Sequence, residues 1–164
     1  MKIRNVLAFL LVLLMASSAW AAGTVVVTSD FSYAGISGAK ETRQIVYTVT
    51  FGADASSPTA VALDNILKSG VRIPTVAGWW LLEVSTLFGA TAPTDNSDLY
   101  LYRAIGTNKV DVLGGNGENK IDNATNNTFT PATTTRPLLG TELLSMSNNA
   151  VNNATFTLVL WLYR

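Results

Sequence analysis

The chain contains no cysteine and no histidine among its 164 residues. Disulfide bonds are therefore excluded, and so are thiolate nucleophiles, serine–histidine pairs and zinc sites built on histidine or cysteine. Charged residues are also scarce, at 13% of the chain, and 11 basic residues balance 11 acidic ones. Because they form no basic patch or stripe, we expect neither nucleic-acid binding nor adsorption to an anionic membrane.

Carboxylates are the remaining candidates for catalysis, as a pair of the kind that hydrolyses glycosidic bonds. Glu83, Glu118, Asp122 and Glu142 are spread along the chain, and no pattern in the sequence brings two of them together. Solvated surface charges account for them better. We therefore expect a protein that is not an enzyme and has no catalytic residues.

The first 21 residues have the layout of a bacterial-type secretory signal peptide. Lys2 and Arg4 form a basic start, residues 6–15 are an unbroken apolar run, and residues 19–21 form a small-x-small cleavage site. The apolar run is shorter than the ~20 residues that a membrane span needs. We expect cleavage before Ala22, no membrane span after signal removal, and an exported protein in the periplasm, the medium or on a cell or particle surface.

Residues 22–164 have the length of one domain. Removing Lys2 and Arg4 from the 11 basic residues leaves 9 against 11 acidic ones, so the mature chain is nearly neutral. A domain of this size buries roughly two-thirds of its unfolded surface and needs no metal or disulfide to fold. Its polar bulk comes from Thr, Ser and Asn, which is typical of β-proteins with many turns.

Alternation of apolar and polar residues predicts an all-β fold. The segment 42–51 is the clearest case, with Ile45, Tyr47, Val49 and Phe51 on one face. Further strands are expected at 24–28, 78–89, 98–105, 110–113, 142–146 and 155–163. Seven to eight short strands separated by turns indicate a single antiparallel β-sandwich, jelly-roll-like in its connections.

Three segments depart from this alternation. Apolar residues at helical spacing and the following Gly70 predict one short helix near 61–68. Residues 30–40 contain two glycines and are expected to form a turn-rich link. The Asn- and Thr-rich stretch 116–136 is expected to be a long loop with a short strand near Ile121 or Phe129.

The strand at 78–89 carries two adjacent tryptophans. Its even positions are almost wholly apolar, so Trp80, Leu82, Val84 and Phe88 are expected to face the core. Trp79 would then lie on the outer face or under a neighbouring loop.

Aromatic residues provide one candidate binding site. Trp79 and Trp80, with Tyr100 and Tyr102 on the next strand, are candidates for a platform that stacks on sugar rings. Adjacent strand residues point to opposite faces, so the two indoles cannot form one flat surface. The alternative is that these aromatic side chains pack in the core.

Oxygen-bearing residues provide a second candidate site. The segment 114–122 nearly fits the G-G-x-G-x-D-x-U-x pattern of calcium-binding β-rolls, with Asn119 in place of the aspartate and Asp122 following. Asp95 and Asp98 lie in a nearby loop. All four are candidate Ca²⁺ ligands, while the alternative is a single glycine-rich turn with aspartates that cap turns.

Four sequence pieces follow one another from Gly78 to Arg164. They are Gly-Trp-Trp-Leu-x-Glu-Val at 78–84, Ala-Thr-Ala-Pro-Thr-Asp-Asn-Ser-Asp-Leu at 90–99, Asp-Val-Leu-Gly-Gly at 111–115 and Leu-Leu-Ser-Met-Ser-Asn-Asn at 143–149. In this order they resemble small virion-associated, decoration-like structural proteins of tailed phages and prophages. The resemblance implies a β-sandwich that coats or joins particles as an oligomer, and it implies no catalytic residues.

Together these observations favour a non-catalytic exported structural protein that acts by self-association or by contact with protein partners. It would be a phage-virion-like decoration protein or a subunit of a surface assembly. The alternative is an extracellular glycan- or calcium-binding β-sandwich module. No cofactor is required by the first hypothesis, and Ca²⁺ is the one cofactor of the second.

Overall fold

The structure is a computed structural model that describes residues 22–33, 41–68, 71–72, 75–132 and 137–164. The expected signal peptide, residues 1–21, lies outside this range. The described residues contain eleven strands and one 3-10 helix, and no α-helix. The all-β class predicted from the sequence is therefore confirmed.

Nine strands form two antiparallel sheets. The five-stranded sheet has the order β1 (Thr24–Tyr33), β2 (Thr42–Thr50), β11 (Thr155–Tyr163), β6 (Trp80–Phe88) and β9 (Asn127–Phe129). The four-stranded sheet has the order β3 (Val61–Ala62), β10 (Leu143–Ser147), β7 (Asp98–Ile105) and β8 (Asn108–Asp111). A small separate hairpin joins β4 (Leu67–Lys68) and β5 (Val71–Arg72).

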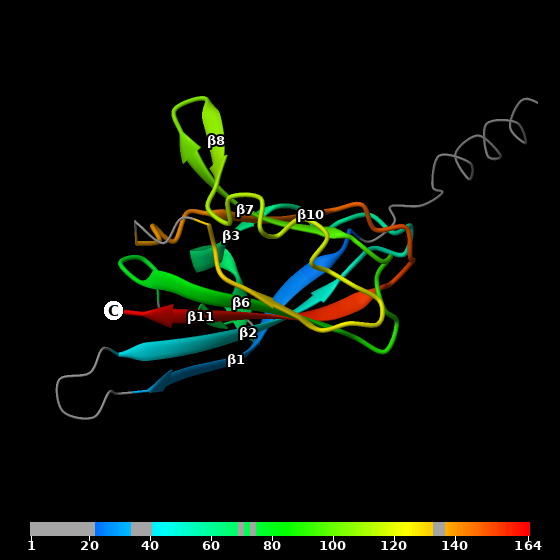
Figure 1. Cartoon of the computed structure of the whole chain (residues 1–164), viewed down its shortest axis with the longest axis horizontal. Helices are drawn as coiled ribbons and strands as arrows, with labels where there is room; N and C mark the ends of the chain where they lie inside the picture. Colours follow the sequence, from blue (N-terminus) through cyan, green and yellow to red (C-terminus); the bar gives the residue numbers. More distant parts are fainter. Residues whose placement is uncertain (1–21, 34–40, 69–70, 73–74, 133–136) are drawn as a thin grey trace, which may run out of the picture.

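The pairing of these strands is that of a jelly roll. Without β1 and the small hairpin, eight strands remain, and they pair first with last, second with seventh, third with sixth and fourth with fifth. This is the pattern of one long hairpin folded over into two sheets. Figure 1 shows the two sheets as layers, with β11 central in the five-stranded one. The jelly-roll-like sandwich is thus confirmed.

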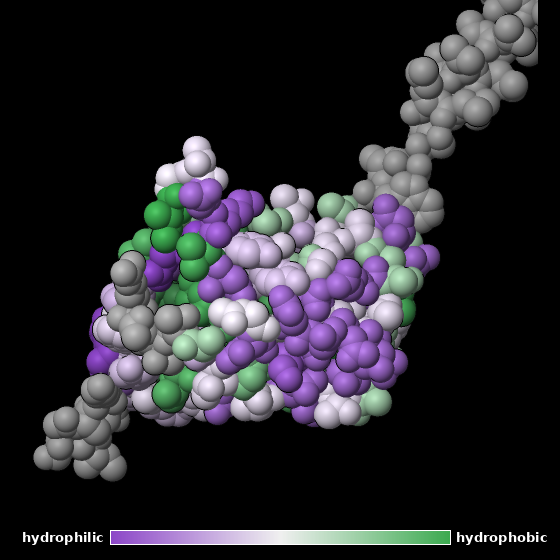
Figure 2. Space-filling model, turned by 45° about the horizontal axis from the view of Figure 1, so that its top comes forward, coloured by the Kyte–Doolittle hydropathy of each residue, from purple (hydrophilic) through white to green (hydrophobic). Residues whose placement is uncertain are grey.

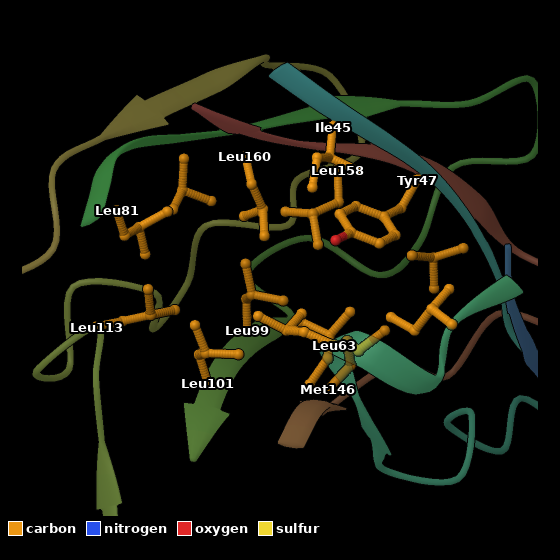
Figure 3. Packing of buried hydrophobic residues seen from close by; sticks show 14 of the residues in the cluster. Ile45, Tyr47, Leu63, Leu81, Leu99, Leu101, Leu113, Met146, Leu158 and Leu160 are labelled. Atoms are coloured by element: carbon orange, nitrogen blue, oxygen red, sulfur yellow. The ribbon is translucent and has the colours of Figure 1, made fainter. Parts of the chain in front are cut away.

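The core lies between the two sheets. Figure 3 shows side chains of β2, β6 and β11 meeting those of β7 and β10, with Leu63 and Leu113 closing the sides from the connections. The hydroxyl of Tyr47 points into this interior. The predicted inward face of 42–51 is confirmed, since Ile45, Tyr47, Val49 and Phe51 are all buried. In β7, Leu99 and Leu101 are buried as well.

The predicted facing of the 78–89 strand is only half right. Trp79, Leu81, Val84 and Thr86 are buried, whereas Leu82 is 47% exposed. The cause is a β-bulge. Trp161 of β11 pairs with Glu83, but the next residue, Leu162, pairs with Leu81. The extra residue reverses the alternation, so odd positions face inward before the bulge and even positions after it. Trp79 is therefore a core residue.

The predicted helix at 61–68 is wrong. The segment forms β3, the 3-10 helix η1 (Leu63–Asn65) and β4. The amides of Leu63 and Asp64 donate to the carbonyl oxygens of Glu142 and Gly140. These bonds tie the segment to the chain before β10. Apolar residues at this spacing fit a buried, extended segment as well as a helix when the run is short.

Of the two predictions on irregular segments, the bounds of the first are corrected and the short strand in the second is confirmed. The turn-rich link expected at 30–40 begins later, because β1 continues to Tyr33, and residues 34–40 lie outside the described residues. The strand expected near Ile121 or Phe129 is present as β9. Ile121 also makes an isolated bridge with Ser97.

The sandwich has two chemically different ends. One end, which we call the turn end, is built from the loops 51–58, 89–97 and 148–154. The other, the arginine end, contains two guanidinium–carboxylate pairs: Arg43 with Asp30 at 2.9 Å and Arg103 with Glu142 at 2.5 Å. The β7–β8 hairpin projects from the body at the arginine end (Figure 1).

Candidate functional site

The predicted tyrosine pair lies on the outer face of the four-stranded sheet. Tyr100 and Tyr102 are two residues apart on β7, and their ring centroids are 5.3 Å apart with planes 12° from parallel. The ammonium of Lys109, on β8, lies 5.9 Å from the centroid of the Tyr102 ring. The pair is a small aromatic surface rimmed by charge.

Burial and, to a smaller extent, acidic neighbours raise the pKa values of both hydroxyls of this pair. Partial burial raises the pKa of Tyr100 above its usual value, and the carboxylates of Asp98 and Glu118 raise it further. Burial also raises the pKa of Tyr102, with Asp111 adding to the effect. The Tyr100 hydroxyl donates to Asp98 at 3.3 Å. The tyrosines are thus hydrogen-bond donors over a wide pH range.

The two tryptophans are not part of that surface. Trp80 lies on the outer face of the five-stranded sheet, where its ring stacks on Tyr163 at a centroid distance of 6.2 Å. Trp79 is 4% exposed, and the guanidinium groups of Arg43 and Arg164 lie 5.6 Å and 4.5 Å from the centroid of its ring. The structure therefore divides the four predicted aromatic residues among two outer faces and the core.

The candidate calcium ligands mostly hold turns. Asp98 is buried and accepts hydrogen bonds from the Asn119 amide at 2.9 Å, from Ser147 at 3.2 Å and from Asn148. Asp122 accepts from the amides of two residues that follow it, at 2.8 Å and 3.1 Å, and these donors lower its pKa. Asp98 and Asn119 are brought together, but through a backbone N–H rather than through oxygen ligands.

Asp95 is exposed in the loop before β7. Among the described residues, no three carboxylates or other metal-ligating side chains gather into a group that could hold a metal ion. Only Asp122 caps a turn in the manner of the alternative. Asp98 instead joins the start of β7 to Asn119 and Asn148, which are distant in sequence.

A polar pocket of about 700 Å³ opens beside the edge strand β9. One wall is formed by Glu83 of β6, by two residues of β9 and by the residue that follows β9. The other wall is formed by the loop that follows β8. The lining residues are Glu83, Gly115, Asn116, Glu118, Asn119, Lys120, Thr128, Phe129 and Thr130. Two carboxylates, one ammonium, two amides and two hydroxyls therefore converge on one hollow.

The loop wall of this pocket is fixed by its own hydrogen bonds. Asp111 accepts from the amides of Leu101 and Leu113, both at 3.1 Å, and of Gly115 at 2.9 Å. The side-chain amide of Asn116 donates to the backbone carbonyl of Thr130 at 2.9 Å. A Cβ at Gly117 would overlap the carbonyl oxygen of Leu99. Gly117 therefore serves a close backbone approach, while Gly114 and Gly115 have the positive φ that favours glycine in turns.

A second surface lies on the outer face of the five-stranded sheet at the arginine end. It is formed by five aromatic residues, which we call the aromatic face: Phe31, Tyr33, Trp80, Trp161 and Tyr163. Tyr33 stacks on Trp161 at a centroid distance of 6.5 Å, with planes 22° from parallel. Phe31 and Tyr33 are about half exposed, at 53% and 49%.

The aromatic face and the pocket are continuous. Trp161 is the direct cross-strand partner of Glu83 on the outer face, and Glu83 lines the pocket. Sequence reasoning missed this arrangement because it needs the strand order. Only the pairing of β11 with both β2 and β6 brings Trp161 next to Glu83 and close to Tyr33.

Comparisons of the chain with protein-family models, with curated proteins and with solved structures find no match. Within the part of the chain that the structure describes, no helix is long and apolar enough to cross a membrane.

Proposed function

We propose that this protein is a non-catalytic, exported structural protein that works by protein–protein contact. It would act as a decoration-like subunit of a phage-type particle or as a subunit of a cell-surface assembly. The jelly roll supports this at the level of fold, because viral capsid proteins use the same architecture. A shared fold alone does not carry a function, so the proposal rests on a surface.

The β7–β8 hairpin is the observation that carries the proposal. It projects from the body (Figure 1), and its last three cross-strand pairs lie beyond the last residue of β7 that pairs with β10. Ile105 and Val110 are 51% and 49% exposed, and Leu139 in the neighbouring connection is 52% exposed. On the face drawn in Figure 2, hydrophobic surface gathers round this hairpin and hydrophilic surface at the opposite end.

An exposed, projecting, aliphatic hairpin is costly to leave in water. Burying two half-exposed aliphatic side chains against a partner stabilises a contact by about 1 kcal/mol or more. The free edge of β8 also offers backbone donors and acceptors for pairing with another chain. Both features favour docking of the hairpin against a second copy or against a particle subunit.

The test is the mass of the purified protein by size-exclusion chromatography with light scattering, over a range of concentrations. We expect oligomers in the wild type and their loss in Ile105→Asp. Ala104→Asp is the matched control, because Ala104 is exposed on the opposite side of the same hairpin. A wild type that stays monomeric at high concentration and captures no particle protein would rule the proposal out.

A further inference from the structure

We infer that the aromatic face and the adjoining pocket bind an uncharged oligosaccharide. The site is different from the hairpin, so this inference does not rest on the proposed function. It differs also from the platform predicted from Tyr100 and Tyr102, which lies on the other sheet.

The aromatic face has the geometry that sugar stacking needs. Pyranose rings present C–H groups that pack on the faces of aromatic rings. The ring planes of Tyr33 and Trp161 are 22° from parallel, and those of Trp80 and Tyr163 are 28° from parallel. The centroids within each pair are more than 6 Å apart. At this distance the rings are offset rather than fully overlapped, and the half-exposed Phe31 and Tyr33 leave aromatic surface open to a ligand.

Polar side chains stand between the aromatic rings. Gln44 lies on β2 between Phe31 and Trp161, and Thr42 lies between Tyr33 and Tyr163. Both can donate and accept hydrogen bonds. Alternating aromatic and polar positions suit a ligand that is apolar on its ring faces and hydroxylated at its edges.

The pocket supplies hydrogen-bonding groups next to this face. Glu83 and Glu118 are acceptors, Lys120 is a donor, and the amides of Asn116 and Asn119 are both. Because Asp111 and Asn116 hold the loop wall in place, these groups are ordered before a ligand arrives. Such preorganisation lowers the entropy cost of binding.

Charge selects the class of sugar. The pocket holds two carboxylates, Glu83 and Glu118, against the single ammonium of Lys120. A uronic or sialic acid would be repelled by the excess negative charge. A neutral oligosaccharide satisfies the same groups through its hydroxyls.

The same charge disfavours a protein partner at this face. The centres of protein–protein interfaces are depleted of charged residues. Here Glu83 lies directly beside Trp161, the residue at the junction of the aromatic face and the pocket. A dry protein contact over Trp161 would have to desolvate that carboxylate, whereas a wet, hydroxyl-rich ligand would not.

The experiment is a binding screen of the purified protein on an array of uncharged and anionic oligosaccharides. Titration calorimetry with the strongest uncharged binder follows. We expect Trp161→Ala to weaken binding by about tenfold, since one aromatic stacking contact is worth roughly that factor. Glu83→Gln, which keeps the shape of the side chain, is expected to weaken it several-fold. Phe88→Ala is the control, because Phe88 is a 44% exposed aromatic at the other end of β6.

Each outcome decides the inference. Weaker binding in both variants, with Phe88→Ala unchanged and all proteins melting cooperatively, supports it. Three results overturn it: no uncharged glycan bound by the folded wild type, binding of anionic glycans alone, or binding that Glu83→Gln and Trp161→Ala leave unchanged. A change of mass in Trp161→Ala without glycan binding would mark the face as a protein interface. A monomer that binds glycan would overturn the assembly proposal and leave this one standing.

Discussion

At the turn end of the sandwich the loops are joined by backbone amides and by one carboxylate, that of Asp98, whereas at the arginine end they are joined by two guanidinium–carboxylate pairs. The Thr155 amide donates to Thr91 at 2.7 Å, and the Asn153 amide to Gly52 at 2.9 Å. At the other end, Arg43 and Arg103 each pair with a carboxylate and also donate to a backbone carbonyl, of Thr75 and Pro137 respectively.

The two ends therefore have different roles: the turn end stabilises the fold, and the arginine end also carries the surfaces proposed to bind partners. At the turn end, among the described residues, the donors to Asp98 are neutral and no ion pair joins the loops. The arginine end needs charge pairs because it carries the irregular connections around Trp79. It is also the end with the aromatic face and the projecting hairpin. The arginine end thus combines the two guanidinium–carboxylate pairs with the surfaces that we propose bind partners.

The largest expected effect is at the arginine end. Glu142 is fully buried and accepts from the Nε of Arg103 and from the amides of Leu139 and Gly140, each at 2.9 Å. Glu142→Ala leaves a largely buried guanidinium without its carboxylate and two amides without their acceptor. We expect a loss of about 3–5 kcal/mol in the free energy of unfolding, measured by denaturant titration.

Glu41→Ala is the control for that variant. Glu41 pairs with Arg164 at 2.6 Å, but the Arg164 side chain is 56% exposed. Solvent screening limits such a pair to less than about 1 kcal/mol. Equal losses in the two variants would show that burial of the ion pair does not distinguish the arginine end.

A smaller effect is expected at the turn end. Asn149 accepts from the Thr94 amide at 3.0 Å and donates to the Val151 carbonyl at 2.8 Å. Asn149→Ala removes both bonds at a partly buried position, so we expect a loss of about 1–2 kcal/mol. Because no ion is involved, the loss should be the same at low and high salt. A strong salt dependence of this loss in thermal melts would contradict the neutral character of the Asn149 contacts.

The smallest effect at neutral pH is expected at Tyr47, whose hydroxyl lies in the core. It is buried and has no hydrogen-bond partner among the described residues. Burial raises its pKa well above the usual value, while Arg43 lowers it in part. Tyr47→Phe removes an unsatisfied group, so we expect a change within about 1 kcal/mol near neutral pH, toward higher stability.

The same residue predicts an alkaline dependence. Above the ordinary tyrosine pKa of about 10, the unfolded chain loses the proton while the folded protein keeps it. Stability is therefore unaffected below that pH and falls as the pH rises above it. Denaturant titrations on both sides of this pKa should show the fall in the wild type and a smaller one in Tyr47→Phe. Identical slopes would mean that Tyr47 is not the buried titrating group.

Local alternation was enough to predict much of the fold. The strands at 98–105 and 155–163 have the predicted bounds, and the inward residues of 42–51 are the predicted ones. In each case successive side chains point to opposite faces of the sheet, so a half-buried strand shows apolar residues at every second position. The bulge at Leu82–Glu83 was not predictable in this way. It depends on which residues of β11 pair with β6, and the sequence of β6 alone does not contain that register.

The candidate site was less accessible to sequence reasoning for the same reason. The stacking of Tyr100 with Tyr102 follows from their spacing on one strand. The nearness of Glu83 to Glu118, or of Tyr33 to Trp161, follows only from strand order and from the course of the loop after β8. The prediction of a helix at 61–68 was wrong because the segment is held by hydrogen bonds to residues 140–142. These partners are distant in sequence, so the local pattern does not reveal them.

The position of β11 has a consequence for how the protein is made. This strand is the last of the eleven that the structure describes, yet it lies between β2 and β6 in the five-stranded sheet. During synthesis, β2 and β6 leave the ribosome with no central strand to join them, so the sheet can close only after residue 163 is made. Pairings this distant in sequence form slowly. The four-stranded sheet has all its strands before β11 is made, so the two layers of the sandwich are completed at different times.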